Sequence, residues 1–173
     1  MELFEAIKGR RSIRKFKEED VDDELIGKIV EAGIWAPSAG DLQSWNAIIV
    51  KDDQEKIKIA MAAYFQDFIA KAPVIIVMCA NRANAGARYG ERGRDLYCIQ
   101  DTACATQNIM LAAYALGLGA AWIGAFKEED IAKLLNLPDY LRPVALIPVG
   151  YSDEAPKAPP RRSVEEAVRN EKY

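Results

Sequence analysis

The uncharged stretch Thr102–Phe126, TACATQNIMLAAYALGLGAAWIGAF, is the strongest indication of how this chain folds. Its length would suffice to span a bilayer, but Gln107 and the Gly117–Gly119 break interrupt it. A glycine just past the last apolar residue of a helix is a common helix stop. We therefore predict a long helix over Asp95–Leu116, followed by a buried strand over Ala120–Ile123, and no membrane span.

The rest of the chain mixes helices and strands without a regular βαβ order. Apolar spacing and glycine or proline stops predict helices over Leu3–Gly9, Leu25–Trp35, Gln54–Ala70 and Lys127–Leu135, a terminal turn or helix over Val164–Arg169, and strands over Ala47–Val50, Val74–Cys79 and Val144–Val149. The charged, glycine-containing segment Asn81–Gly93 is predicted to be a mobile loop. Because two helices precede the first strand, we predict an α+β fold, with residues 1–173 forming one domain.

The glycine pair at Gly117 and Gly119 is not a dinucleotide-binding motif. That motif needs a strand before the glycines and a helix after them, and here the order is reversed. A helix stop is the better interpretation.

Composition excludes several functional classes. The chain has 173 residues, a formal net charge of −3 and no histidine. An acidic chain is not expected to have nucleic acid as its main partner. The lack of histidine excludes His-based hydrolases and His-ligated metal sites. The three cysteines, Cys79, Cys98 and Cys104, form no C-x-x-C pair, so we expect reduced thiols, no metal site and a cytoplasmic location, and the N-terminus shows no secretory signal.

Two basic clusters stand out in this acidic chain. Arg10, Arg11 and Arg14 surround Ser12 just after the first predicted helix, and Arg161-Arg162 follow two prolines near the other end. In an extended segment Arg10, Ser12 and Arg14 share one side, which would suit a phosphate. The alternative for the first cluster is a solvated basic turn after a helix, and the alternative for Arg161-Arg162 is a solvated linker.

Two further segments could approach a flat ligand. Pro37–Trp45, PSAGDLQSW, joins small residues to Gln43 and Trp45, and Trp122–Phe126, WIGAF, ends a strand with exposed backbone N–H groups. An ordinary loop and a simple strand end remain the alternative interpretations.

Five motifs together resemble the nitroreductase family of FMN-dependent oxidoreductases, particularly its short members. The resemblance covers nearly the whole chain and includes RRSIRKF, PSAGDLQSW, QNIMLAAYALGLGAAWIG, RPVALIPVGY and PRRSVEE, at Arg10–Phe16, Pro37–Trp45, Gln107–Gly124, Arg142–Tyr151 and Pro160–Glu166. Each motif alone is modest, but the five in this order are specific.

The resemblance implies a fold, an assembly and a cofactor site. We expect a central, mainly antiparallel or mixed sheet flanked by helices, in an intertwined homodimer with FMN at the subunit interface. By this resemblance Arg10, Ser12 and Arg161 would hold the FMN phosphate, with Arg162 as a second contact, and Arg14 would lie near the pyrimidine end of the flavin. The implied FMN-binding residues are Arg10, Arg11, Ser12, Arg14, Pro37, Ser38, Ala39, Gly40, Gln43, Ile123, Gly124, Ala125, Arg161 and Arg162.

The implied division between subunits and the implied reaction follow the same resemblance. Pro37–Gly40 would come from the partner subunit, and the backbone of Gly124 and Ala125 would face flavin N5. The activity would be an NAD(P)H oxidoreductase that transfers hydride, by ping-pong kinetics, to an electron-poor acceptor such as a nitroaromatic or a quinone. The alternatives are a dehalogenase or enoate reductase, a non-catalytic flavin-binding protein, and a phosphate-binding module without flavin.

Two residues depart from the pattern that many members show. Asp41 stands where members often have asparagine, and Ser44 where they often have proline. A carboxylate beside a reduced flavin is unfavourable, so we expect Asp41 to point away or to pair with an arginine of the Asn81–Gly93 segment. Members differ in that segment, so the resemblance implies neither the acceptor nor a preference between NADH and NADPH.

Overall fold

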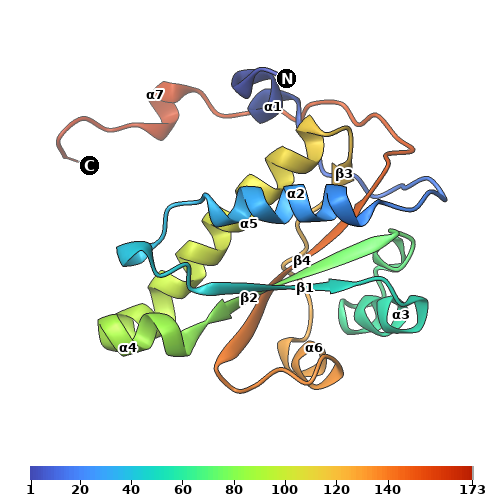
Figure 1. Ribbon diagram of the computed structural model, residues 1–173. Helices are drawn as coiled ribbons and strands as arrows, with labels where there is room; N and C mark the ends of the chain where they lie inside the picture. Colours follow the sequence, from blue (N-terminus) through green and yellow to red (C-terminus); the bar gives the residue numbers. More distant parts are fainter. Residues whose placement is uncertain (173) are drawn as a thin grey trace.

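The computed structural model describes residues 1–172 as an antiparallel sheet with helices on both faces (Figure 1). The strands are β1 (Trp45–Val50), β2 (Val74–Asn81), β3 (Gly119–Ala120) and β4 (Leu141–Gly150). Their order across the sheet is β1-β2-β4-β3, and every neighbouring pair is antiparallel. The predicted α+β class with a mainly antiparallel sheet is confirmed.

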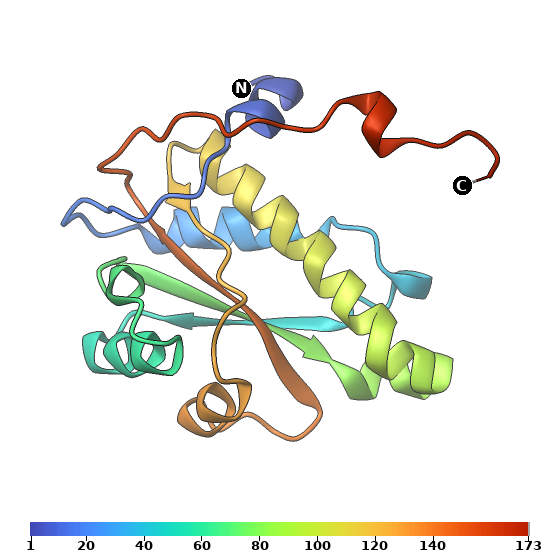
Figure 2. The ribbon, with the colours of Figure 1, turned by 180° about the vertical axis from the view of Figure 1, so that it is seen from behind.

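Seven α-helices and three short helical turns surround this sheet in the described residues. They are α1 (Leu3–Gly9), α2 (Asp23–Ile34), α3 (Asp53–Ala62), α4 (Arg82–Arg92), α5 (Cys98–Ala115), α6 (Glu128–Leu134) and α7 (Val164–Ala167), with turns η1 (Ala39–Asp41), η2 (Asp67–Ile69) and the π-helical η3 (Gly93–Tyr97). Figures 1 and 2 show α2 and α5 on one face of the sheet and α3 and α6 on the other.

The buried core therefore has two layers, one on each side of β2. Along this strand Ile76 and Met78 pack in the layer formed with α2 and α5, while Ile75 and Val77 pack in the layer formed with α3 and α6. A strand covered on both faces needs an unbroken apolar run, and residues 74–80 are all buried.

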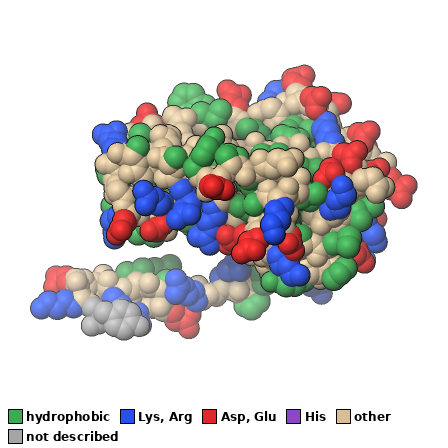
Figure 3. Space-filling model, turned by 90° about the horizontal axis from the view of Figure 1, so that it is seen from below, with side chains coloured by type: hydrophobic (Ala, Val, Ile, Leu, Met, Phe, Trp, Pro, Cys, Tyr) green, Lys and Arg blue, Asp and Glu red, His purple; other side chains and the backbone are tan. Residues whose placement is uncertain are grey.

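Helix α1 and the segment that follows β4 lie side by side on the α2/α5 side of the sheet (Figures 1 and 2). After β4 the chain runs back past α1, and its last segment extends away from the body as an arm that carries α7 (Figures 2 and 3). All residues of this arm from Ala158 to Lys172 are exposed. An exposed arm of this length needs another surface if it is to be ordered by packing.

The prediction of a loop over Asn81–Gly93 is wrong. The segment forms α4, whose first turn is capped by the Asn81 side chain, which accepts a hydrogen bond of 3.0 Å from the Asn84 N–H. Ala85 is fully buried and fixes the helix on the sheet. The glycines that suggested a loop instead allow a sharp break: Gly90 has φ 58° and ψ −141°, which side chains disfavour.

Other predicted elements also differ from the structure in their bounds, among them the following three. The helix predicted over Gln54–Ala70 ends at Ala62, because Tyr64 and Phe65 both adopt a φ of 58° and reverse the chain. The helix predicted over Asp95–Leu116 starts as the π-helical turn η3 before α5. The strand predicted over Ala120–Ile123 is only Gly119–Ala120, with Ile123 forming an isolated bridge to Leu146.

Within residues 1–172, no helix combines the length and the apolar character that crossing a membrane requires. The same residues contain no cluster of three or more metal-ligating side chains of the His, Cys, Asp or Glu types.

Candidate functional site

Guanidinium groups from the two ends of the chain meet beside α1. Arg10 follows the last turn of α1, and its backbone N–H donates to the Ala6 carbonyl at 3.0 Å. The pKa of Arg10 is lowered from its usual value, first by burial and next by the positive charges of Arg161 and Arg11. Arg10 Nε is buried and has no hydrogen-bond partner within the described chain. Such an arrangement favours an anion that would neutralise the charge and accept the unused hydrogen bond.

This basic cluster has no internal counter-ion. In residues 1–172 neither Arg10, Arg11 nor Arg161 forms a salt bridge. A hollow of about 290 Å³ lies between α1 and the C-terminal segment and is lined by Arg11, Arg161 and Lys8. The positive charges of Arg161 and Arg11 act on Arg10 in the free chain, and a bound phosphate would offset this repulsion.

The residues after Arg10 run along the edge of the sheet. Ser12 pairs in parallel with Ala120, and the Ile13 N–H donates to the Ala120 carbonyl at 3.0 Å. Ile13 is only 7% exposed and lies against Gly119, where an added Cβ would come within 2.8 Å of it. Gly119 is therefore required for the close approach of these two segments.

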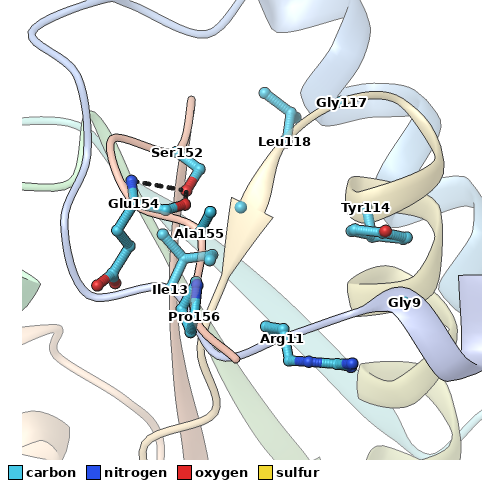
Figure 4. Close-up of a pocket in the computed structure, with 11 residues that line it drawn as sticks. Gly9, Arg11, Ile13, Tyr114, Gly117, Leu118, Ser152, Glu154, Ala155 and Pro156 are labelled. Carbon is cyan, nitrogen blue, oxygen red and sulfur yellow. Dashed lines mark hydrogen bonds between the residues drawn. The ribbon is translucent and has the colours of Figure 1, made fainter. Parts of the chain in front are cut away.

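Residues Arg10–Arg14, which run along the edge of the sheet, are named here the edge segment, and alternate residues in it point to opposite sides. Arg11 and Ile13 both line a pocket of about 300 Å³ between α5 and the Ser152–Pro156 segment (Figure 4). Arg11 Nη1 also donates to the carbonyls of Lys8 and Arg10, each at 2.7 Å. Arg11 thus satisfies the end of α1, and the predicted alternation leaves the other side of the segment to Arg10, Ser12 and Arg14.

Arg14 is held by the segment that follows β4. The Glu154 carboxylate accepts from the backbone N–H groups of Arg14 and Lys15, and the Asp153 N–H donates to the Lys15 carbonyl at 2.9 Å. The Arg14 guanidinium lies over the Phe68 ring, 5.8 Å from its centroid. These contacts fix an exposed cation next to the edge of the sheet.

The backbone at Gly124 and Ala125 is open. Ile123 exchanges hydrogen bonds of 2.9 and 3.0 Å with Leu146, and the Ala125 carbonyl accepts from Gln66 Nε2 at 3.2 Å. Within the described chain the N–H groups of Gly124 and Ala125 donate no hydrogen bond. Two fixed, unused donors beside the Arg14 segment could bind an acceptor atom of a ligand.

The Pro37–Gln43 loop, named here the PSAG loop, is held at the opposite end of α5. Asp101 Oδ1 accepts from the Ala39 N–H at 2.9 Å, and Ser38 Oγ accepts from the Gln43 N–H at 2.9 Å. Gly40, Asp41 and Gln43 all have positive φ angles, between 49° and 59°. The loop is therefore a strained, fixed structure of the kind that functional sites often contain.

Helix α4 supports the PSAG loop from the outside. Arg88 Nη1 donates to the Gly40 carbonyl at 3.1 Å, and Asn84 Nδ2 donates to the Leu42 carbonyl at 2.9 Å. Of the two alternatives expected for Asp41, the pairing with an arginine of this segment does not form, since Asp41 has no salt bridge in the described chain and accepts only from Gln43 Nε2, at 3.4 Å.

One chain therefore brings together only part of the predicted site. Arg10, Arg11 and Arg161 meet, and Ser12, Arg14 and Ile123–Ala125 continue from them along one edge. The PSAG loop lies apart, because Asp101 is near the start of α5 while Gly9 packs on Tyr114 near its end. At the rise of an α-helix, those two positions are about 20 Å apart. Arg162 is exposed and forms no salt bridge with any of the residues that the structure describes.

Sequence interpretation missed four residues that support the site: Asp101, Glu154, Phe68 and Arg88. Asp101 had a visible signal, since it is the last charge before the long uncharged stretch and is only 4% exposed in the fold. No feature of the sequence indicated the role of Glu154, because its partners are backbone N–H groups distant in sequence.

Comparison with known proteins agrees with this architecture. The sequence model of the nitroreductase family matches residues 7–65 and 59–151. A candidate NADH dehydrogenase/NAD(P)H nitroreductase of Methanothermobacter thermautotrophicus is 38% identical, over 90% of this chain and 80% of its own length. The FMN reductase [NAD(P)H] of Bacillus subtilis is 31% identical, over 98% of this chain and 73% of its own length. The solved NADPH:FMN oxidoreductase of Vibrio harveyi in complex with NAD⁺ superposes with a TM-score of 0.90 at 27% identity, covering 98% of this chain and 77% of that one. With its sequence, its sheet and its helix arrangement in agreement, this chain belongs to the nitroreductase family.

Proposed function

We propose that this protein is an FMN-dependent NAD(P)H oxidoreductase in which the whole chain forms a single FMN-binding domain. The observation that carries the proposal is the convergence of Arg10 and Arg161, from opposite ends of the chain, with no salt-bridge partner for either among residues 1–172. The names of its relatives support the same class, since they include an FMN reductase and an NADPH-flavin oxidoreductase.

The residues present fit the phosphate end of FMN. Arg10 offers a buried Nε that lacks a partner, and Arg161 adds a second guanidinium. Ser12 follows on the same side of the edge segment as Arg10 and would add a hydroxyl donor. Burial, and next the positive charges of Arg161 and Arg11, lower the pKa of Arg10, and a phosphate, which carries nearly two negative charges at neutral pH, would offset both effects.

The residues at the other end of the edge fit a flavin ring. FMN, when bound, supplies the hydride acceptor and donor at N5 of its ring. Arg14 would stabilise negative charge on the pyrimidine side, with Phe68 and Glu154 holding it in position. The free N–H groups of Gly124 and Ala125 would bind ring acceptors, and Gln66 would keep that backbone fixed.

We further propose that the site is completed by a second copy of this chain. The PSAG loop is too far along α5 to meet the arginine cluster of its own chain, about 20 Å away at helical rise. Large apolar side chains remain exposed on both terminal segments: Phe4 is 69% exposed and Val164 is 71% exposed. Burying such residues against a partner would stabilise a homodimer whose PSAG loops cross to the opposite site.

We propose sequential use of one site. The reduced nicotinamide and the acceptor would approach the same face in turn, which gives ping-pong kinetics, and an electron-poor nitroaromatic or quinone is the proposed acceptor. The chain has no histidine, so protons would come from solvent or from non-histidine groups.

The test is the visible spectrum of the purified protein, recorded without oxygen before and after NADH or NADPH is added. The proposal predicts a flavin spectrum that bleaches rapidly with at least one donor. A flavin spectrum that no donor bleaches would indicate a storage protein instead. A colourless protein that does not bind added FMN would contradict the proposal.

A further inference from the structure

Two arginines and two tyrosines form a compact surface cluster beside the PSAG loop, named here the Arg–Tyr cluster. The Tyr89 and Tyr97 rings meet edge to face with centroids 5.3 Å apart. The Arg88 guanidinium lies 5.4 Å from the Tyr89 centroid, and the Arg92 guanidinium lies 5.3 Å from the Tyr97 centroid. Arg92 Nε also donates to the Tyr97 hydroxyl at 2.9 Å.

An irregular backbone builds this cluster. Gly90 breaks α4 with φ 58° and ψ −141°, and the chain then turns through the π-helical η3. Gly93 lies so close to the Ala85 carbonyl that an added Cβ would come within 2.2 Å of its oxygen. These features bring Tyr89 back against Tyr97. Single π-helical turns inside α-helices are frequent at functional sites, and strained backbone concentrates there.

The cluster is joined directly to the proposed flavin loop. Arg88 donates to the Gly40 carbonyl at 3.1 Å, and an added Cβ at Gly40 would lie 2.3 Å from the Tyr89 hydroxyl. The Arg88 and Tyr89 side chains of the cluster therefore contact the backbone of the PSAG loop. The inference drawn from this contact rests on the proposed function, which brings that loop to a flavin.

The cluster has free positive charge in an acidic protein. Arg88 and Arg92 are both exposed, and neither forms a salt bridge within residues 1–172. The whole chain carries a formal net charge of −3. Two uncompensated guanidinium groups held on tyrosine rings suit phosphate oxygens next to a flat base, because the planar fork binds oxygens in pairs and the rings offer stacking surface.

We propose that the Arg–Tyr cluster binds the phosphate groups of the reduced nicotinamide dinucleotide while its nicotinamide ring enters beside the PSAG loop. Binding there selects a phosphate-bearing donor over a bare dihydronicotinamide. Both NADH and NADPH carry the pyrophosphate that this site recognises.

The test compares Arg92→Gln and the double variant Arg88→Gln/Arg92→Gln with Lys133→Gln, an exposed lysine of α6 on the opposite face of the sheet. The first readout is the KM for NADPH divided by the KM for 1-benzyl-1,4-dihydronicotinamide, a donor without phosphate. We expect this ratio to rise about fivefold for the single and more than about tenfold for the double variant, and to stay unchanged for Lys133→Gln. The second readout is calorimetric titration with ADP, where we expect about fivefold weaker binding for Arg92→Gln.

The outcomes separate this inference from the proposed function. Unchanged ratios and unchanged ADP binding in both arginine variants would overturn the inference while leaving flavin reduction intact. An equal rise in KM for NADPH and for the benzyl donor would also overturn the inference, because it would indicate that the substitutions had displaced the PSAG loop. If the unmodified protein holds no FMN, or if no donor reduces it, the proposed function itself fails.

Discussion

Replacing Asp101 tests how the PSAG loop is held. Its carboxylate is only 4% exposed, its Oδ1 accepts from the Ala39 N–H at 2.9 Å, and its Oδ2 has no partner within the described chain. Asp101→Ala removes this hydrogen bond between α5 and the loop. A hydrogen bond to a charged group contributes about 1.5–3 kcal/mol, and relief of the buried charge offsets part of it. We expect the free energy of unfolding to fall by about 1–2 kcal/mol.

The same variant is expected to weaken FMN. If the loop contributes contacts to the flavin, its loosening lowers FMN affinity about tenfold, equivalent to about 1.4 kcal/mol. Asp101→Asn keeps an acceptor for the Ala39 N–H, so we expect it to lose less unfolding free energy and less FMN affinity than Asp101→Ala. Asp139→Ala, an exposed residue of the α6–β4 connection, is the control. Urea unfolding of the FMN-free protein and fluorescence titration with FMN measure the two effects.

Two results would refute this reasoning. An Asp101→Ala protein as stable as the parent would mean that the hydrogen bond does not hold the loop. A destabilised variant that binds FMN as tightly as Asp139→Ala would mean that the loop lies outside the flavin site.

Three further predictions concern other parts of the molecule. The pKa of Glu128 is lowered chiefly by its hydrogen bond with Arg142, so Glu128→Gln should cost about 0.5 kcal/mol of stability at pH 7, and the difference from the parent should vanish as pH falls below about 4; a loss that persists at pH 3 would contradict it. Gly150→Ala should lower the free energy of unfolding by about 1–3 kcal/mol, because the new Cβ would lie 2.6 Å from Pro73 Cδ, and an unchanged urea midpoint would disprove that contact. Burial raises the pKa of Cys79 to about 12, so a thiol reagent at pH 8 should modify it only after unfolding, as mass mapping of the labelled peptide can establish.

Apolar periodicity predicted the core elements well. The run Val74–Cys79 was predicted to be a buried strand, and β2 is a strand covered on both faces. The alternation after Arg10 was also predictable, and Arg11 and Ile13 indeed line one pocket together. Local sequence carries this information because burial and side-chain period are set by neighbours in the chain.

Long-range packing decided what the sequence did not predict. Gly93 suggested a loop, yet it serves a close approach to the Ala85 backbone inside a helical segment. Tyr64 and Phe65 disfavour positive φ, so no propensity places the end of α3 there. Glu154 supports Arg14 only because β4 returns the chain to the edge segment. Such roles depend on contacts between distant segments, and they leave no periodic signal.

The sequence indicated which residues belong to the candidate site, but it did not indicate how they are arranged in space. Charge alone singled out Arg10 and Arg161, because two basic clusters are conspicuous in an acidic chain. Their proximity is a property of the fold, which runs the C-terminal segment back past α1. The family resemblance, rather than any physical pattern, assigned the PSAG loop to a second subunit.

The central claim is that arginines from opposite ends of the chain bind one flavin phosphate, and the most direct test compares FMN with riboflavin, which lacks that phosphate. Dissociation constants of both ligands are measured for the parent, for Arg10→Ala and for Arg161→Ala. We predict that each variant loses about 1.5–3 kcal/mol of FMN binding and keeps its riboflavin affinity. Unchanged FMN binding in both variants, or an equal loss for riboflavin, would contradict the account.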